Sequence, residues 1–233
     1  MNITIIGGHG KVALLATPLL IEAGHSVHSI IRKESQSEDI RALGGAPVVA
    51  DIESMSVEEI ATLLKELNTQ VLVWSAGAAG QGGPERTYAV DRDAAIRSMD
   101  AAAAAGIERY IMVSYLGADP NHGIDPDNGF YTYAEAKAAA DEHLRASSLR
   151  YTILGPGALV DGEAGGIDLD LQLAVGGLDE LVSRTVARAT VAAVLAAVID
   201  DESTVHKALP FIDGSTPIAQ AVASAPAQNR LRP

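Results

Sequence analysis

Short apolar segments rich in β-branched residues alternate along the chain with longer segments rich in alanine, leucine and glutamate. Continuous apolar runs are typical of strands that are covered on both faces of a parallel sheet. The longer segments have the composition and the end signals of helices. The expected strands are residues 3–6, 26–31, 47–50, 70–74, 109–113, 151–154 and 208–212, and the expected helices are residues 11–23, 37–43, 86–105, 133–147, 189–199 and 217–223, with a further helix that begins at Ser56.

This alternation predicts βαβ units and therefore an α/β fold: a doubly wound, Rossmann-type parallel sheet with helices on both faces. Residues 1–157 carry the regular pattern and are expected to form the core. The periodicity weakens over residues 158–188, which are rich in glycine and aspartate. We predict that residues 158–223 form a small segment on the substrate side of the same domain, and that residues 224–233 are a frayed tail.

The charge balance excludes two classes of partner. The chain has 233 residues, with 17 Lys and Arg against 30 Asp and Glu, so its net charge is −13. Such a charge disfavours binding to nucleic acid or to an anionic membrane surface. Hydrophobic residues make up 48%, enough for a sizeable core, yet no apolar run reaches the ~18 residues that span a bilayer. We therefore expect a small-molecule substrate, without a nucleic-acid or membrane partner.

The chain contains no cysteine, which excludes a disulfide framework and a thiolate site. The first residues have a strand pattern without a basic segment before it, so we do not expect a secretion signal. Both observations favour a cytoplasmic location. His9 has no acidic or histidine partner at ligand spacing, so no metal site is expected. Both a monomer and a homodimer are compatible with the sequence.

A glycine-rich turn separates the first expected strand from the first expected helix. Gly7, Gly10 and Ala13 have the spacing G-x-x-G-x-x-G/A, and Lys11 and Val12 open the helix. The first glycine permits a tight turn, the second lets the backbone approach a pyrophosphate, and a small third residue lets helix and strand pack closely. The free N–H groups of the helix attract phosphate. The position of the motif predicts a dinucleotide site in residues 1–157, although such turns also occur without a ligand.

The end of the second expected strand bears on which dinucleotide is bound. An acidic residue there selects NAD, whereas an arginine accommodates the 2′-phosphate of NADP. Here the strand ends in Arg32 and Lys33. A guanidinium can hold a phosphate through two hydrogen bonds, which makes Arg32 the first candidate and Lys33 the second. The sequence thus favours NADP over NAD, and the alternative is a pair of solvated cations.

Tyr133 and Lys137 are four residues apart, so they project from one face of a predicted helix. A phenol with a pKa of about 10 is a poor acid–base catalyst, and a nearby ammonium lowers that pKa. Ser114 ends the preceding strand, at the sheet edge where α/β proteins bind ligands. These three residues are the candidate catalytic set. The alternative is a purely structural pair, because the same spacing occurs where a tyrosine is buried in the core and the lysine extends its ammonium into solvent.

Taken together, these motifs resemble the short-chain dehydrogenase/reductase superfamily, and above all its atypical branch of small NAD(P)-binding, NmrA-like proteins. The resemblance covers most of the chain, about residues 1–220, and includes the Thr-Ile-Leu-Gly-Pro-Gly segment at residues 152–157. The family often has arginine where this chain has Gly155. That departure bears on the substrate and not on the cofactor.

The resemblance implies further cofactor contacts along the carboxyl ends of the strands. Residues after the third strand would lie at the adenine, and residues after the fourth would line the path of the ribose and nicotinamide. A turn after the sixth strand would border the nicotinamide, and Lys137 would also hold the nicotinamide ribose. The implied contacts are Asp51, Ile52, Ser75, Ala76, Gly77, Pro156 and Gly157.

The resemblance also implies an activity: an NADP-dependent oxidoreductase that reduces a small carbonyl-like or quinone substrate, with NAD as the other possible cofactor. In that reaction Tyr133 transfers the proton, Lys137 adjusts the pKa of Tyr133, and Ser114 orients the substrate oxygen. Two alternatives stay open. One is a redox sensor that binds NADP(H) without turnover. The other is a nucleotide-sugar epimerase or dehydratase, for which the last third of the chain is short.

Overall fold

The computed structural model describes residues 1–78, 80–169 and 183–226. Its strands are β1 (Asn2–Ile6), β2 (Ser26–Ile31), β3 (Ala46–Val49), β4 (Val71–Trp74), β5 (Arg109–Val113), β6 (Arg150–Pro156), β7 (Ala158–Val160), β8 (Gly166–Leu169), β9 (Thr185–Ala187) and β10 (Lys207–Gly214). The main sheet has the order β3-β2-β1-β4-β5-β6-β10-β8, and β7 pairs with β9 separately. All neighbours in the main sheet are parallel except β10 and β8. The predicted doubly wound fold is confirmed.

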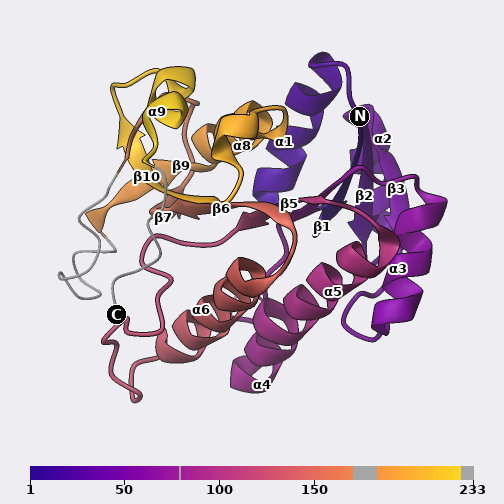
Figure 1. The fold of residues 1–233 in the computed structure, drawn as a ribbon, viewed down its shortest axis with the longest axis horizontal. Coiled ribbons are helices and arrows are strands. Elements are labelled where there is room, and N and C mark those ends of the chain that lie inside the picture. The colour runs from indigo at the N-terminus through magenta and orange to yellow at the C-terminus, as the bar shows by residue number, and fades with distance from the viewer. Residues whose placement is uncertain (79, 170–182, 227–233) are drawn as a thin grey trace.

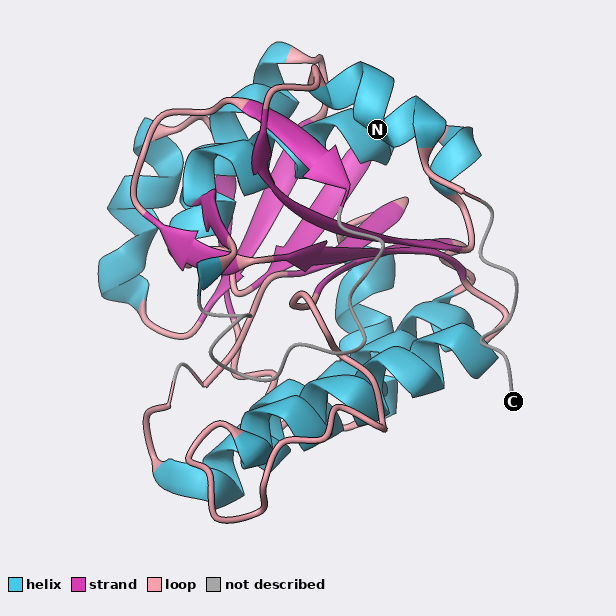
Figure 2. Ribbon diagram, turned by 90° about the vertical axis from the view of Figure 1, so that its left-hand side faces the viewer, coloured by secondary structure: helices cyan, strands magenta, loops and turns pink. Residues whose placement is uncertain are grey.

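Helices cover both faces of this sheet (Figures 1 and 2). They are α1 (Lys11–Glu22), α2 (Ser37–Ala42), α3 (Val57–Glu66), α4 (Gly83–Thr87), α5 (Ala95–Ala105), α6 (Tyr131–Ala146), α8 (Arg188–Ile199) and α9 (Ile218–Ser224), with two short 3₁₀ turns and the π-helical segment η2 (Tyr88–Ala94). Helices α1 and α8 pack together on one face, while α3, α5 and α6 lie on the other.

Alternate residues of the strands supply two separate cores. In β4, Val71 and Val73 join the core beneath α1 and α8, whereas Leu72 and Trp74 join the core beneath α3 and α5. All four side chains are essentially buried. Burial on both faces explains why the strands appear in the sequence as continuous apolar runs and not as alternating ones. The sheet is therefore a rigid base for the loops at its carboxyl edge.

The segment after residue 157 contains structure that its weak periodicity did not predict. β7, β8 and β9 all lie between residues 158 and 188, and residues 170–182 of that segment lie outside the described part. The predicted last strand is confirmed as β10, which pairs with β6 and so extends the main sheet. Residues 227–233 of the predicted tail also lie outside the described part.

Two helices contain features that usually interrupt a helix. Pro18 lies inside α1 without breaking it. The expected helix at residues 86–105 begins three residues earlier and runs through α4, η2 and α5, so its middle is π-helical. Such wider turns are common at functional sites. No helix in the described ranges is both long and apolar enough to cross a membrane.

A capping box predicts the cost of one substitution at the start of α3. The Ser56 hydroxyl accepts a hydrogen bond from the N–H of Glu59, and the Glu59 carboxylate accepts one from the N–H of Ser56. Ser56→Ala removes the first bond and should lower the free energy of unfolding by about 1 kcal/mol in urea denaturation. Ser56→Thr keeps a hydroxyl oxygen as the acceptor, so it should retain most of the free energy of unfolding that Ser56→Ala loses. Equal stability of the wild type and Ser56→Ala would contradict this account.

Candidate dinucleotide and catalytic site

The glycine turn after β1 lies directly against the loop after β4. Gly7 has a φ of +83°, and a Cβ added there would lie 2.6 Å from the Ala76 Cα. A Cβ added at Gly8 would lie 2.4 Å from the Ser29 Cβ on β2. Any side chain would force these backbones apart. Gly7 thus makes the tight turn that the sequence motif predicted, and the absence of a Cβ at Gly7 and Gly8 also lets this turn lie against the ends of β2 and β4, which the motif did not predict.

The same turn leads into the N-terminus of α1. The Gly10 N–H donates to the Gly7 carbonyl at 2.8 Å, which closes the turn. Gly10 is the N-cap of α1 and supplies no side-chain cap. Since the first N–H groups of a helix have no partner within it, α1 presents donors and a partial positive charge at this point. This arrangement suits a phosphate group.

A pocket of about 280 Å³ opens beside this turn, along the carboxyl ends of β1, β2, β3 and β4. Its walls combine the backbone of the glycine turn, apolar side chains and a polar rim. The sequence-predicted residues that line it are Gly7, Gly10, Arg32, Asp51, Ile52, Ser75, Ala76 and Gly77. The structure thus brings together loops from four strands, as expected for the adenosine side of a dinucleotide site.

The remaining predicted cofactor residues lie outside the lining of this pocket. Lys11 is largely exposed, and its Nζ lies 3.6 Å from an Asp161 carboxylate oxygen. Val12 is buried in the core, and Lys33 is exposed. The roles of these three residues stay predictions.

Pro156 and Gly157 lie farther along the sheet edge, at the end of β6. The Pro156 carbonyl accepts a hydrogen bond from Leu116, and the Gly157 N–H donates to Phe211. Backbone contacts therefore fix this turn, and its place beside the nicotinamide stays a prediction.

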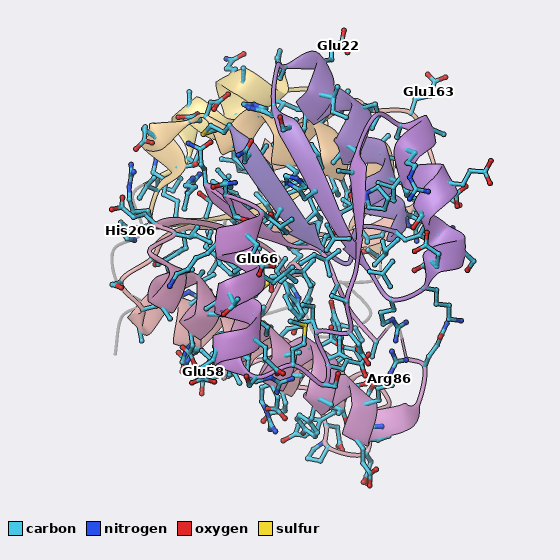
Figure 3. All side chains as sticks on the ribbon, turned by 90° about the vertical axis from the view of Figure 1, so that its right-hand side faces the viewer. Glu22, Glu58, Glu66, Arg86, Glu163 and His206 are labelled. Atoms are coloured by element: carbon cyan, nitrogen blue, oxygen red, sulfur yellow. The ribbon has the colours of Figure 1, made fainter. Side chains whose placement is uncertain are left out.

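At the rim of the pocket Arg32 makes an ion pair that the sequence did not predict. Its Nη1 donates to Glu53 Oε1 at 3.0 Å, and Arg86 Nη2 on α4 donates to the same oxygen at 2.8 Å. Arg86 also donates from Nε to Oε2 at 3.4 Å. These hydrogen bonds and the two positive charges lower the pKa of Glu53. Figure 3 labels Arg86, which lies on the same side of the sheet as Glu58 of α3.

Tyr133 and Lys137 both belong to α6, one helical turn apart, as the spacing predicted. Lys137 is almost fully buried, at 1% exposed. Its Nζ donates to the Val113 carbonyl at the end of β5 at 3.0 Å and contacts Met112 Sδ at 3.5 Å. Since both partners belong to β5, these contacts fix the lysine over the end of the central sheet.

Two buried carboxylates share their surroundings with Lys137. Asp91 and Asp141 are each 1% exposed, and burial raises the pKa of both carboxyls, which the Lys137 charge opposes. Burial lowers the pKa of Lys137 against the attraction of both carboxylates. Asp91 lies in the π-helical segment η2 and accepts a hydrogen bond from the Ala78 N–H at 3.0 Å. This bond ties the helix to the loop that lines the pocket.

Ser114, which directly follows β5, makes a contact that the sequence did not predict. Its hydroxyl donates to Asp141 Oδ2 at 2.6 Å, and the residue is 5% exposed. This hydrogen bond joins the end of β5 to α6. The structure thus gives Ser114 a contact with the buried carboxylate. Its predicted contact with a substrate oxygen stays a prediction.

Aromatic rings surround the Tyr133 side chain. The ring centroids of Tyr115 and Phe130 lie 5.4 and 5.2 Å from that of Tyr133. Burial is the largest cause that raises the pKa of Tyr133, and the charges of Asp91 and Asp141 add to it. The sequence predicted the opposite direction, a lowering by Lys137; burial and the two carboxylates outweigh the ammonium, which donates to the Val113 carbonyl instead. The phenol is protonated at neutral pH, as a proton donor must be.

Sequence reasoning missed five residues of this region: Glu53, Arg86, Asp91, Tyr115 and Asp141. Asp91 and Asp141 each occupy a helix among apolar neighbours. An acidic residue on the apolar face of an expected helix was the available signal. Arg86 and Glu53 carried no comparable pattern, since charged residues beside helix starts are usually solvated.

Comparison with known proteins places this geometry in a family. The NAD(P)H-binding family matches residues 7–202. A Bacillus subtilis protein named as an uncharacterized sugar epimerase is 34% identical, with 95% of this chain and 99% of that protein covered.

Two solved structures are similar over nearly the whole chain. One, from Bacillus halodurans, has a TM-score of 0.82 and 32% identity, covering 95% of this chain and 98% of that one. The other is an oxidoreductase from Lactococcus lactis with a TM-score of 0.80 and 25% identity, covering 96% of each chain.

The buried carboxyl of Asp141 predicts how stability depends on pH. Because its pKa is raised on folding, the folded state holds this proton more tightly than the unfolded state. Stability from this group is therefore present below the unfolded pKa, about 4, and is lost as the pH rises. The free energy of unfolding of the wild type minus that of Asp141→Asn should fall with pH, by up to about 1.4 kcal/mol per unit.

Urea denaturation of both proteins across a series of pH values measures this difference. The Asp141→Asn side chain retains an oxygen that can accept the Ser114 hydrogen bond, so the two proteins differ in the ionisable carboxyl and in its effect on the pKa of Lys137. A difference that stays constant or grows with pH would contradict the account.

Proposed function

This chain belongs to the NAD(P)H-binding family of atypical short-chain dehydrogenase/reductase type, and we propose that it is an NADP-dependent oxidoreductase that reduces a small carbonyl-like or quinone substrate. The glycine turn packed against the loop after β4 carries this proposal. A Cβ at Gly7 would meet the Ala76 backbone, so this contact needs a glycine whatever ligand is present. The result is a wall of backbone beside a helix N-terminus, which fits the pyrophosphate of a dinucleotide.

The rim of the pocket supports NADP over NAD. Arg32 and Arg86 both line it. Guanidinium groups hold phosphate through paired, charge-assisted hydrogen bonds. Glu53 and Asp51 also line the pocket, so the formal charge of these four side chains is zero. NAD is the alternative cofactor. In that case an acidic residue would accept a hydrogen bond from the 2′-hydroxyl of the ribose.

Tyr133 is the proposed proton donor. When bound, the nicotinamide supplies the hydride that the reduction requires. The neutral Tyr133 phenol gives its proton to the substrate oxygen as negative charge develops there. Lys137 favours the phenolate that this step leaves, and its contact with Val113 fixes its position. Ser114 acts in this scheme by holding Asp141 beside Lys137. The aromatic rings around Tyr133 suit a flat, conjugated substrate.

An epimerase is the second candidate, because the similar Bacillus subtilis protein carries that name. An epimerase would use the same cofactor without net consumption. The two functions therefore differ in one measurable quantity, the loss of NADPH during turnover. A sensor without turnover would show binding alone.

Replacement of the proposed proton donor tests the mechanism. Tyr133→Phe should reduce NADPH-dependent turnover of carbonyl and quinone substrates by at least about a hundredfold, since it removes the acid. The affinity for NADPH should change little. Tyr131→Phe is the matched control, because it removes a hydroxyl from the first turn of the same helix. The measurement is NADPH oxidation followed by absorbance, alongside binding titrations of each variant.

Full activity of Tyr133→Phe would remove this residue from the mechanism. Binding of NADPH without net oxidation on any substrate of the panel would favour the epimerase or the sensor.

A further inference from the structure

Two arginines from distant parts of the chain converge on one carboxylate. Arg32 follows β2, Glu53 follows β3, and Arg86 lies in α4. Both guanidinium groups bond the same oxygen of Glu53. The pairing of β2 with β3 does not by itself require α4 to place an arginine at the rim of the pocket. The convergence marks a position where the fold collects positive charge around an anion.

We infer that Arg86 is a second ligand of the cofactor's 2′-phosphate, and that Glu53 competes with that phosphate for Arg32 and Arg86. This inference rests on the proposed binding of NADP. It assigns the selectivity for NADP over NAD to the interaction among Arg32, Glu53 and Arg86, and not to Arg32 alone.

The geometry supports a phosphate at this position. Arg86 presents Nε and Nη2 to the two oxygens of Glu53, the side-on arrangement that also suits a phosphate. The Arg86 side chain is 25% exposed against 55% for Arg32. Because solvent screens charges at exposed positions more, the contact of Arg86 should be the stronger of the two.

The competing charges determine the expected direction of each change. Glu53 and Asp51 face these arginines from the loop after β3, and the Asp51 and Asp91 charges also act on Arg86. A phosphate that binds both guanidinium groups must weaken their bonds to Glu53. Neutralising Glu53 therefore frees two cations for the phosphate, while neutralising Arg86 leaves one.

Affinity measurements on three variants test the inference. Arg86→Met should weaken the binding of NADP⁺ about tenfold or more, and the binding of NAD⁺ less than about twofold. Arg92→Met is the matched control, since Arg92 follows on the same helical run, pairs with Asp93 and lies outside the pocket lining. Its effect on both cofactors should be less than about twofold. Glu53→Gln should strengthen NADP⁺ binding by about threefold or more.

The titrations use the full chain and calorimetry, with thermal unfolding as a check that each variant is folded. Adenosine 2′,5′-bisphosphate and 5′-AMP serve as smaller probes that differ only in the phosphate at issue. Arg86→Lys retains the charge but not the paired bonds, and should fall between the wild type and Arg86→Met.

Several outcomes would overturn the inference without touching the proposed function. In one such outcome the wild type binds NADP⁺ more tightly than NAD⁺, and Arg86→Met shows the same preference. Another is a Glu53→Gln variant that loses affinity for NAD⁺ and gains none for NADP⁺, because Glu53 would then hold the ribose hydroxyl. If the wild type binds neither dinucleotide, the proposed function fails first.

Discussion

The close approach of the turn after β1 to the loop after β4 is the constraint on which the site depends. β1 and β4 are neighbours in the sheet, so their carboxyl ends deliver both loops to one place. Gly7 makes contact possible because it has no Cβ and adopts a positive φ. The pocket and the start of α1 follow from this contact. A side chain at Gly7 would separate the two loops and disturb every wall that they share.

The second half of the site depends on buried charge. The charges of two carboxylates on different helices, Asp91 and Asp141, act on Lys137, and each of the three groups is nearly inaccessible to solvent. Burying charged groups is costly unless they are paired, so this arrangement fixes η2, α6 and β5 relative to one another. The Asp91 bond to Ala78 then links the buried charges to the pocket. The loop that lines the pocket is therefore bonded to a carboxylate whose charge acts on both Lys137 and Tyr133.

The sequence predicted the fold and the glycine turn because both depend on local patterns. Continuous apolar runs identified the strands of the main core, and the G-x-x-G spacing identified the turn. The contacts of Glu53 with Arg86 and of Ser114 with Asp141 join residues 33 and 27 positions apart. No local pattern specifies such pairs, since they depend on the order of strands in the sheet. β7, β8 and β9 were missed for a related reason: they are short, and their pairing partners are distant.

The proposed NADP dependence is tested most directly by titrating the purified wild-type protein, freed of nucleotide, with NADPH and NADH in parallel. The account predicts saturable binding of NADPH with a dissociation constant at least about tenfold below that of NADH, the difference expected from charge-assisted contacts to one phosphate. Equal affinities, or tighter binding of NADH, would contradict the assignment of the rim arginines. Absence of binding to both would contradict the site itself.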